Sequence, residues 1–153
     1  MNLYIDKNTG NFITDPAFKS EITKVDFKRG DAATLSIGFV TGTTQALLGG
    51  TPLVIFAIKE SGKYDSVDSL VYEDSFVEGA STYDASPNFN TTDLNDLLFS
   101  GDADDTNDVA YVDAMLEVTF SDDNGVTWQS SKTITARIYN DVVKGNEGTV
   151  QSG

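Results

Sequence analysis

Apolar and polar residues alternate most regularly between Tyr111 and Tyr139, and this pattern predicts a β-hairpin. A period of two residues is typical of a strand with one buried face. The residues expected on that face are Ala114, Leu116, Val118 and Phe120 in the first arm and Ile134, Ala136 and Ile138 in the return arm, 132–139. Between the arms, Asn124-Gly125 tolerates the positive φ angles of a tight hairpin turn.

Shorter apolar segments before this hairpin predict further strands. We expect them at residues 3–6, 12–13, 21–28, 34–41, 53–58 and 70–76. The run 53–58 contains no polar residue, which predicts a strand that is buried on both faces. Arg29-Gly30-Asp31 predicts a hairpin turn, residues 42–52 predict a loop, and residues 79–91 predict an irregular segment anchored by Tyr83 and Phe89.

One short helix is predicted near residues 92–99. Thr92 suits the N-cap position, acidic residues occupy the first turn, and Leu94, Leu97 and Leu98 share one face. With about eight short strands, this pattern predicts an all-β fold, an antiparallel β-sandwich (Ig-like or jelly-roll-like) with one short helix. The expected core is Leu35, Ile37, Phe39, Val54, Phe56, Ile58, Leu116, Val118, Phe120, Trp128, Ile134 and Ile138.

The chain is predicted to divide into a β-sandwich domain, residues 1–140, and an extended C-terminal arm, residues 141–153. The arm has three glycines and no hydrophobic period. Its three valines cannot bury enough apolar surface to fix it alone. We therefore expect the arm to become ordered by packing against a neighbouring subunit.

The charge of the chain is strongly negative and unevenly distributed. The net charge is −14, and residues 60–108 hold 13 of the 24 acids but one of the ten bases. Binding to a phosphate backbone is therefore disfavoured, and we expect no nucleic-acid partner. No apolar run is long enough to span a membrane, and the N-terminus lacks the features of a signal peptide. These features predict a soluble protein that is made in the cytoplasm and has no membrane partner.

The absence of histidine and cysteine limits the chemistry that the chain can perform. Catalysis by serine–histidine or cysteine–histidine pairs and thiolate metal sites are excluded. Paired carboxylates can hydrolyse glycosides, but nothing in the sequence distinguishes such a pair from surface acids. We therefore expect no enzymatic activity and no catalytic residues.

Residues 101–108 contain the densest cluster of carboxylates. Asp102, Asp104, Asp105 and Asp108 lie within seven residues. Carboxylate oxygens are ligands that Ca²⁺ prefers, but this spacing lacks the glycine and the terminal glutamate of an EF-hand loop. We expect a solvated loop and no cofactor, and Ca²⁺ bound to these four aspartates is the alternative.

The hairpin turn resembles a known structural pattern. Ser121-x-Asp123-x-Gly125-x-Thr127-Trp128 is similar to the Asp-box of sialidase-type propellers and many unrelated β-proteins. The resemblance implies a structural role, in which the aspartate binds backbone N–H groups of the turn and the tryptophan packs beneath the hairpin. A glycan-binding role for Trp128 is the alternative.

Two longer segments resemble proteins of phage particles. Residues 27–37 followed by 53–59 are similar to N-terminal β-domains of phage baseplate and tail-fibre proteins. Residues 126–149 are similar to small structural proteins encoded among phage virion genes. The resemblance implies a structural role but identifies no binding residue.

Two functions are consistent with these features. The first is a non-enzymatic structural subunit of a phage virion (tail, baseplate, fibre or capsid surface). Such a subunit would be synthesised in the host cytoplasm and would bind other virion proteins and further copies of itself in a homo-oligomer. The alternative is a carbohydrate-binding or adhesin-type β-module that binds a glycan through exposed Tyr64, Tyr72, Tyr83 or Trp128, with Ca²⁺ at the acidic loop as its optional stabilising ion.

Overall fold

The computed structural model describes residues 1–14, 20–30, 34–42, 44–46, 48–49, 52–65, 69–74, 77–78, 82–98 and 109–140. The strands are β1 (Asn2–Asp6), β2 (Phe12–Ile13), β3 (Glu21–Ile22), β4 (Lys24–Lys28), β5 (Leu35–Thr41), β6 (Thr44–Gln45), β7 (Leu53–Glu60), β8 (Ser69–Asp74), β9 (Val77–Glu78), β10 (Tyr83–Ala85), β11 (Tyr111–Ser121), β12 (Gln129–Ser130) and β13 (Ile134–Tyr139), with one described helix, α1 (Thr92–Leu98). The acidic residues 101–108 and the predicted arm, 141–153, lie outside the described residues.

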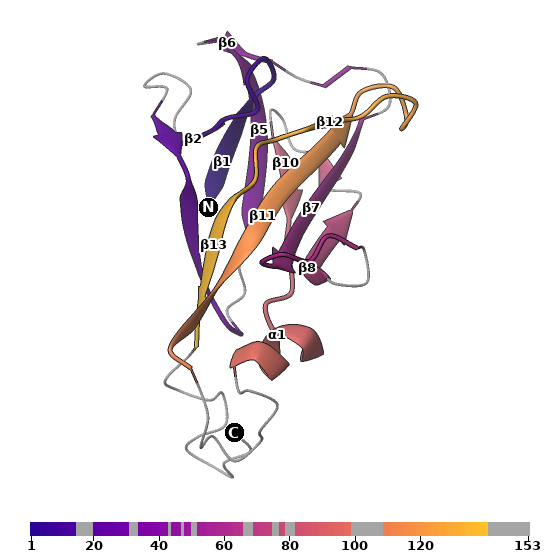
Figure 1. Ribbon diagram of the computed structural model, residues 1–153. Helices are drawn as coiled ribbons and strands as arrows, with labels where there is room; N and C mark the ends of the chain where they lie inside the picture. The colour runs from indigo at the N-terminus through magenta and orange to yellow at the C-terminus, as the bar shows by residue number, and fades with distance from the viewer. Residues whose placement is uncertain are drawn as a thin grey trace.

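The described strands form two sheets that pack face to face, so the prediction of an all-β sandwich with a short helix is confirmed (Figure 1). The first sheet has the order β3-β2-β1-β5-β10-β9, with β6 paired to β5. The second has the order β4-β13-β11-β7-β8, with β12 paired to β11. Most pairs are antiparallel as predicted, but β1 with β5 and β13 with β4 are parallel, so both sheets are mixed.

β11 is the central strand of the second sheet. It pairs along one edge with β7, from Ala114 opposite Glu60 to Ser121 opposite Leu53, and along the other with β13. All seven residues predicted for the buried face of the hairpin are buried. The predicted hairpin is thus confirmed, and Asn124 and Gly125 have the expected positive φ angles of 59° and 83°.

The core lies between the two sheets and is rich in phenylalanine. The rings of Phe27 and Phe89 stack at 4.5 Å between centroids, and Phe39 meets Phe120 at 4.6 Å. Phe39 belongs to the first sheet and Phe120 to the second, so this contact joins the two layers. The predicted core residues are buried, with Trp128 the exception, and Tyr83 and Phe89 are buried as the predicted anchors.

Two connections differ from the predictions because the chain passes between the sheets. The predicted strand 21–28 is interrupted at Thr23: β3 pairs with β2 in the first sheet, whereas β4 lies beside β13 in the second. The turn after β4 is not a hairpin, since β4 and β5 belong to different sheets. Gly30 supplies its positive φ of 80°. The predicted loop 42–52 also contains a short strand, β6.

Helix α1 closes one end of the sandwich (Figure 1). Thr91, rather than Thr92, is its N-cap, because the Thr91 hydroxyl accepts a hydrogen bond from the Leu94 N–H at 3.3 Å. The same hydroxyl donates to the Leu70 carbonyl at 2.6 Å and so ties the helix to β8. Leu94 and Leu98 are fully buried, as their shared face predicts.

Gly38 gives a test of the packing between β1 and β5. It lies opposite Tyr4, and an added Cβ would stand 2.5 Å from the tyrosine ring. We expect Gly38→Ala to lower the free energy of unfolding by about 1–3 kcal/mol, because the ring must move out of its site. Gly49→Ala, where a Cβ meets no atom within 4 Å, should change it by less than about 0.5 kcal/mol. Equal values from urea denaturation would contradict this account.

Candidate functional site

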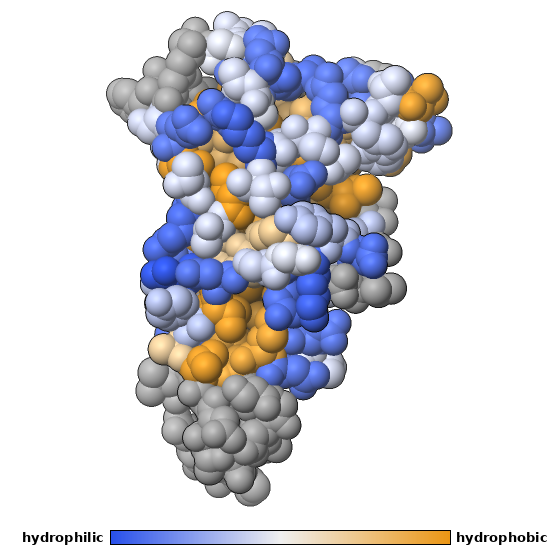
Figure 2. Space-filling model, in the orientation of Figure 1, coloured by the Kyte–Doolittle hydropathy of each residue, from blue (hydrophilic) through white to orange (hydrophobic). Residues whose placement is uncertain are grey.

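The outward face of the second sheet carries the candidate site. Along β7, Val54, Phe56 and Ile58 are buried, whereas Leu53, Ile55 and Ala57 are half-buried. The prediction that this run is buried on both faces is therefore wrong. Its outward side chains remain apolar although none of the described elements covers them. Figure 2 shows hydrophobic side chains at several places on this side of the molecule, among hydrophilic ones.

Two of these outward side chains, Ile55 and Ala57, line a groove of about 400 Å³, which we call the outer-face groove. β7 and β11 supply its floor, with Ile55, Ala57 and Met115 as the apolar part. The groove is further lined by three aromatic rings, those of Tyr64, Tyr72 and Trp128, together with Lys59, Ser69, Glu117, Thr119 and Thr133. A mainly apolar lining with a few polar groups is typical of a ligand site.

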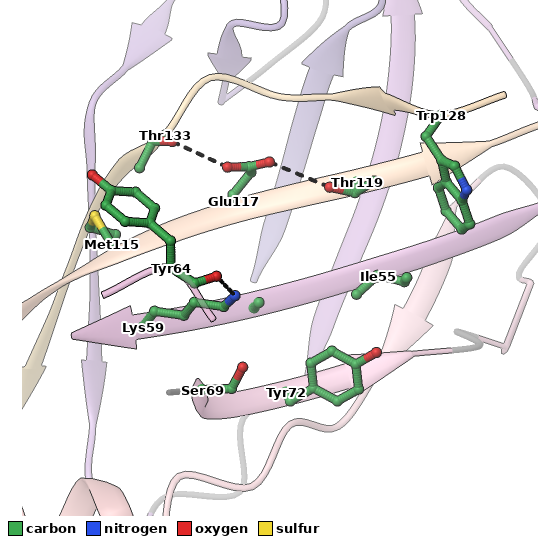
Figure 3. Close-up of a pocket in the computed structure, with 11 residues that line it drawn as sticks. Ile55, Lys59, Tyr64, Ser69, Tyr72, Met115, Glu117, Thr119, Trp128 and Thr133 are labelled. Carbon is green, nitrogen blue, oxygen red and sulfur yellow. Dashed lines mark hydrogen bonds between the residues drawn. The ribbon is translucent and has the colours of Figure 1, made fainter. Parts of the chain in front are cut away.

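The three rings come from separate parts of the chain (Figure 3). Tyr64 follows the turn after β7, Tyr72 belongs to β8, and Trp128 precedes β12. Their exposed fractions are 74%, 52% and 44%. The fold thus brings together three of the four aromatic residues expected from the sequence to be exposed. The fourth, Tyr83, is 2% exposed and lies in the core, so its predicted role as a glycan platform is wrong.

Two charged groups add polar contacts to the groove. Glu117 accepts hydrogen bonds from Thr133 at 3.3 Å and from Thr119 at 3.4 Å, as Figure 3 shows. Lys59 donates to the backbone carbonyl of Tyr64 at 2.7 Å and so ties the loop that carries this ring to β7. An ammonium group has three donors, of which this contact uses one.

The Asp-box-like turn positions Trp128 at the end of the groove. Asp123 accepts hydrogen bonds from the Thr127 N–H at 2.9 Å, the Thr127 hydroxyl at 2.5 Å and the Ser121 hydroxyl at 2.7 Å. Ser121 in turn accepts from the Gly125 N–H at 2.9 Å. The bonds to Thr127, together with that from Ser121, lower the pKa of Asp123 to about 2.

Trp128 is not a core residue, which corrects the prediction. A Cβ at Gly125 would lie 3.3 Å from its Cζ2 and 3.5 Å from a methyl group of Leu53, so the ring packs against the turn that precedes it. The loop ends the alternation of β11 before Trp128, and strand periodicity therefore does not determine the side on which its ring lies.

A second group of side chains occupies the same face near the start of β11. We call it the tyrosine–arginine cluster: Tyr111, Asp113, Arg137 and Tyr139. Arg137 donates to both oxygens of Asp113, at 2.8 and 3.0 Å, and its guanidinium carbon lies 4.1 Å from the centre of the Tyr111 ring. The hydrogen bonds between the two groups raise the pKa of Arg137 and lower that of Asp113.

The remaining site predictions concern the acidic residues. Asp102, Asp104, Asp105 and Asp108 lie outside the described residues, so their Ca²⁺ hypothesis stays a prediction. Within the described part of the chain, no three acidic residues are grouped closely enough to hold a metal ion. The sequence did not single out Ile55, Met115 or Glu117, although the alternation of β7 and β11 places them on the outward face.

Comparisons with known proteins add little to this geometry. No protein-family model matches the chain, and no curated protein matches it. Among solved structures, the N-terminal domain of phage TP901-1 ORF48 matches with a TM-score of 0.38 and 14% identity, over 92% of this chain and 96% of that one. At these values the likeness does not assign a function. None of the described helices is long and apolar enough to cross a membrane.

The pKa of Asp123 predicts how the turn responds to acid. Because this pKa is lower in the folded protein than the usual 3.8, ionised Asp123 stabilises the fold above that value. This stabilisation is lost as the pH falls from 3.8 towards 2. We expect Asp123→Asn to reduce the slope of unfolding free energy against pH in this window, measured by urea denaturation. Asp122→Asn, at an exposed neighbouring residue, is the control. An equal reduction of the slope in both variants would contradict the assignment of this pH dependence to Asp123.

Proposed function

We propose that the chain is a non-enzymatic structural subunit of a phage virion that acts through contacts with other virion proteins and with further copies of itself. The sequence resemblance to phage β-domains supports this proposal. Its segments cover the end of β4, the start of β5, most of β7, and β12 and β13, so they reach both sheets. The absence of histidine and cysteine excludes catalysis that depends on these residues, but it does not distinguish this role from a binding module.

The observation that carries the proposal is the tyrosine–arginine cluster. Tyrosine and arginine are enriched among the residues that dominate protein–protein binding energy. Tyr111 is 42% exposed, although it lies opposite Tyr139 with 5.7 Å between ring centres. The cluster therefore presents aromatic surface to solvent instead of burying it in the core.

The cluster is also held in place before any partner binds. Arg137 is fixed on one side by two hydrogen bonds to Asp113 and on another by the ring of Tyr111. A side chain that is already ordered loses less conformational entropy on binding. The geometry of the cluster thus favours a specific and repeated contact, as subunits of a particle require.

The net charge of −14 adds selectivity to such contacts. Like-charged molecules repel one another, so unspecific association of copies is suppressed. A contact must overcome this repulsion with local complementarity, and Arg137 is a cation positioned to provide it. We propose that the partner surface presents acceptor groups for its guanidinium.

This proposal predicts that the chain is part of the particle. Mass spectrometry of purified virions, from the phage whose genome encodes the chain, should detect it as a stoichiometric component. Washing the particles with increasing salt concentration, which removes loosely bound protein, should not lower the amount of the chain in them. Absence of the chain from washed particles would refute the proposal.

Variants of the tyrosine–arginine cluster test whether incorporation of the chain into particles depends on the proposed contact. We expect the double variant Tyr111→Ala/Tyr139→Ala to lower the amount incorporated into particles by at least about tenfold, since loss of two interface aromatics costs more than 1.4 kcal/mol. Tyr72→Ala, an exposed tyrosine on the same sheet but outside the cluster, is the matched control and should assemble normally.

A further inference from the structure

We propose that the outer-face groove is a binding site for a neutral oligosaccharide. This inference goes beyond the structural role and does not depend on it, because the groove and the tyrosine–arginine cluster contain different residues. Its evidence is the combination of exposed rings, an apolar floor and polar groups in one concave surface.

The lining matches the two kinds of surface that a sugar presents. The C–H faces of a pyranose ring are apolar and pack on aromatic rings, whereas its hydroxyl groups both donate and accept hydrogen bonds. Tyr64, Tyr72 and Trp128 offer the aromatic surfaces around an apolar floor. Glu117 offers a carboxylate acceptor, and Lys59 an ammonium donor, within the same groove. Aromatic residues with a few placed polar groups are what such a ligand needs.

The polar groups also argue against an apolar protein surface as the occupant. Covering the groove with such a surface would remove water from Glu117 and Lys59, whose charges are costly to bury without full hydrogen bonding. The two hydroxyl contacts of Glu117 are long, at 3.3 and 3.4 Å, and so satisfy its carboxylate only weakly. Sugar hydroxyls would supply the missing donors.

The charge of the chain selects among sugars. A net charge of −14 repels polyanions such as nucleic acids and acidic polysaccharides. The groove itself contains one acidic and one basic side chain, Glu117 and Lys59, which gives no excess of positive charge to offset that repulsion. The ligand class that fits is therefore an uncharged glycan.

Two features hold the binding surface ready. Trp128 is fixed by its contact with the Asp-box-like turn, where Gly125 leaves room for the indole ring. Tyr64 is carried by a loop whose backbone carbonyl accepts the hydrogen bond from Lys59. Binding to ordered groups costs less entropy than binding to free ones, so these contacts favour affinity.

The sole tryptophan of the chain provides a direct readout, because it lies in the groove. The test set is short neutral oligosaccharides of glucose, xylose, mannose, galactose or N-acetylglucosamine. We expect at least one of them to produce a saturable change in the fluorescence of Trp128. A polyuronate of similar length should bind more weakly. No response to any neutral sugar in the set, by fluorescence or by calorimetry, would overturn the proposal, as would preference for the polyuronate.

Variants test whether the change comes from the groove. Tyr72→Ala should weaken binding about tenfold, in line with the loss of one stacking ring. Tyr111→Ala removes an exposed tyrosine from the same strand face outside the groove and should leave the affinity unchanged. Circular dichroism should show both variants folded. Equal affinities for Tyr72→Ala and the parent chain would overturn the assignment.

The same variant and sugars also test whether the groove binds a second copy of the chain instead of a sugar. If the chain self-associates through this face, sedimentation should show a dimer that Tyr72→Ala dissociates and that neutral sugars do not. That result would overturn the glycan proposal while leaving the virion role intact. Conversely, sugar binding by a chain that is absent from virions would refute the structural role alone.

Discussion

The two-residue alternation of β11 is the constraint on which both surfaces of the second sheet depend. β11 lies between β7 and β13, and every second side chain enters the core. The side chains between them, Met115, Glu117 and Thr119, face outward into the groove. A shift of one residue in register would exchange the two sets and place Glu117 in the core, which the burial of Leu116 and Val118 forbids.

The Asp-box-like turn links this strand to the candidate function. Its hydrogen bonds around Asp123 are structural, as the resemblance implied, but the ring that follows them is partly exposed. The turn thus fixes the position of a partly exposed ring that lines the groove instead of adding another core residue. Structural and binding roles for the pattern are therefore compatible in this chain, because the turn holds Trp128 and the exposed part of Trp128 is available to a ligand.

Local pattern was sufficient where a segment has one buried face and pairs with its neighbours in sequence. The hairpin of β11 and β13 and the helix near residues 92–99 were predicted for this reason. Pattern failed where long-range pairing decides. Residues 21–28 were predicted as one strand, but the strand is interrupted at Thr23, because β3 pairs with β2 whereas β4 pairs with β13, which follows it by more than a hundred residues. Nor could the sequence decide whether Tyr83 is a buried anchor or an exposed platform, or show that Tyr64 and Tyr72 line one groove. The neighbours of these tyrosines are set by the sheet order.

The division of β11 into a core face and a groove face can be measured with two adjacent substitutions. Leu116→Ala should lower the free energy of unfolding by about 2–5 kcal/mol, because it leaves a cavity in the core. Glu117→Ala should lower it by less than about 1 kcal/mol, since the two hydrogen bonds that it loses are long and partly exposed. Urea denaturation of both variants provides the comparison. Similar losses of stability from the two substitutions would contradict the account, because Glu117 would then support the fold as Leu116 does.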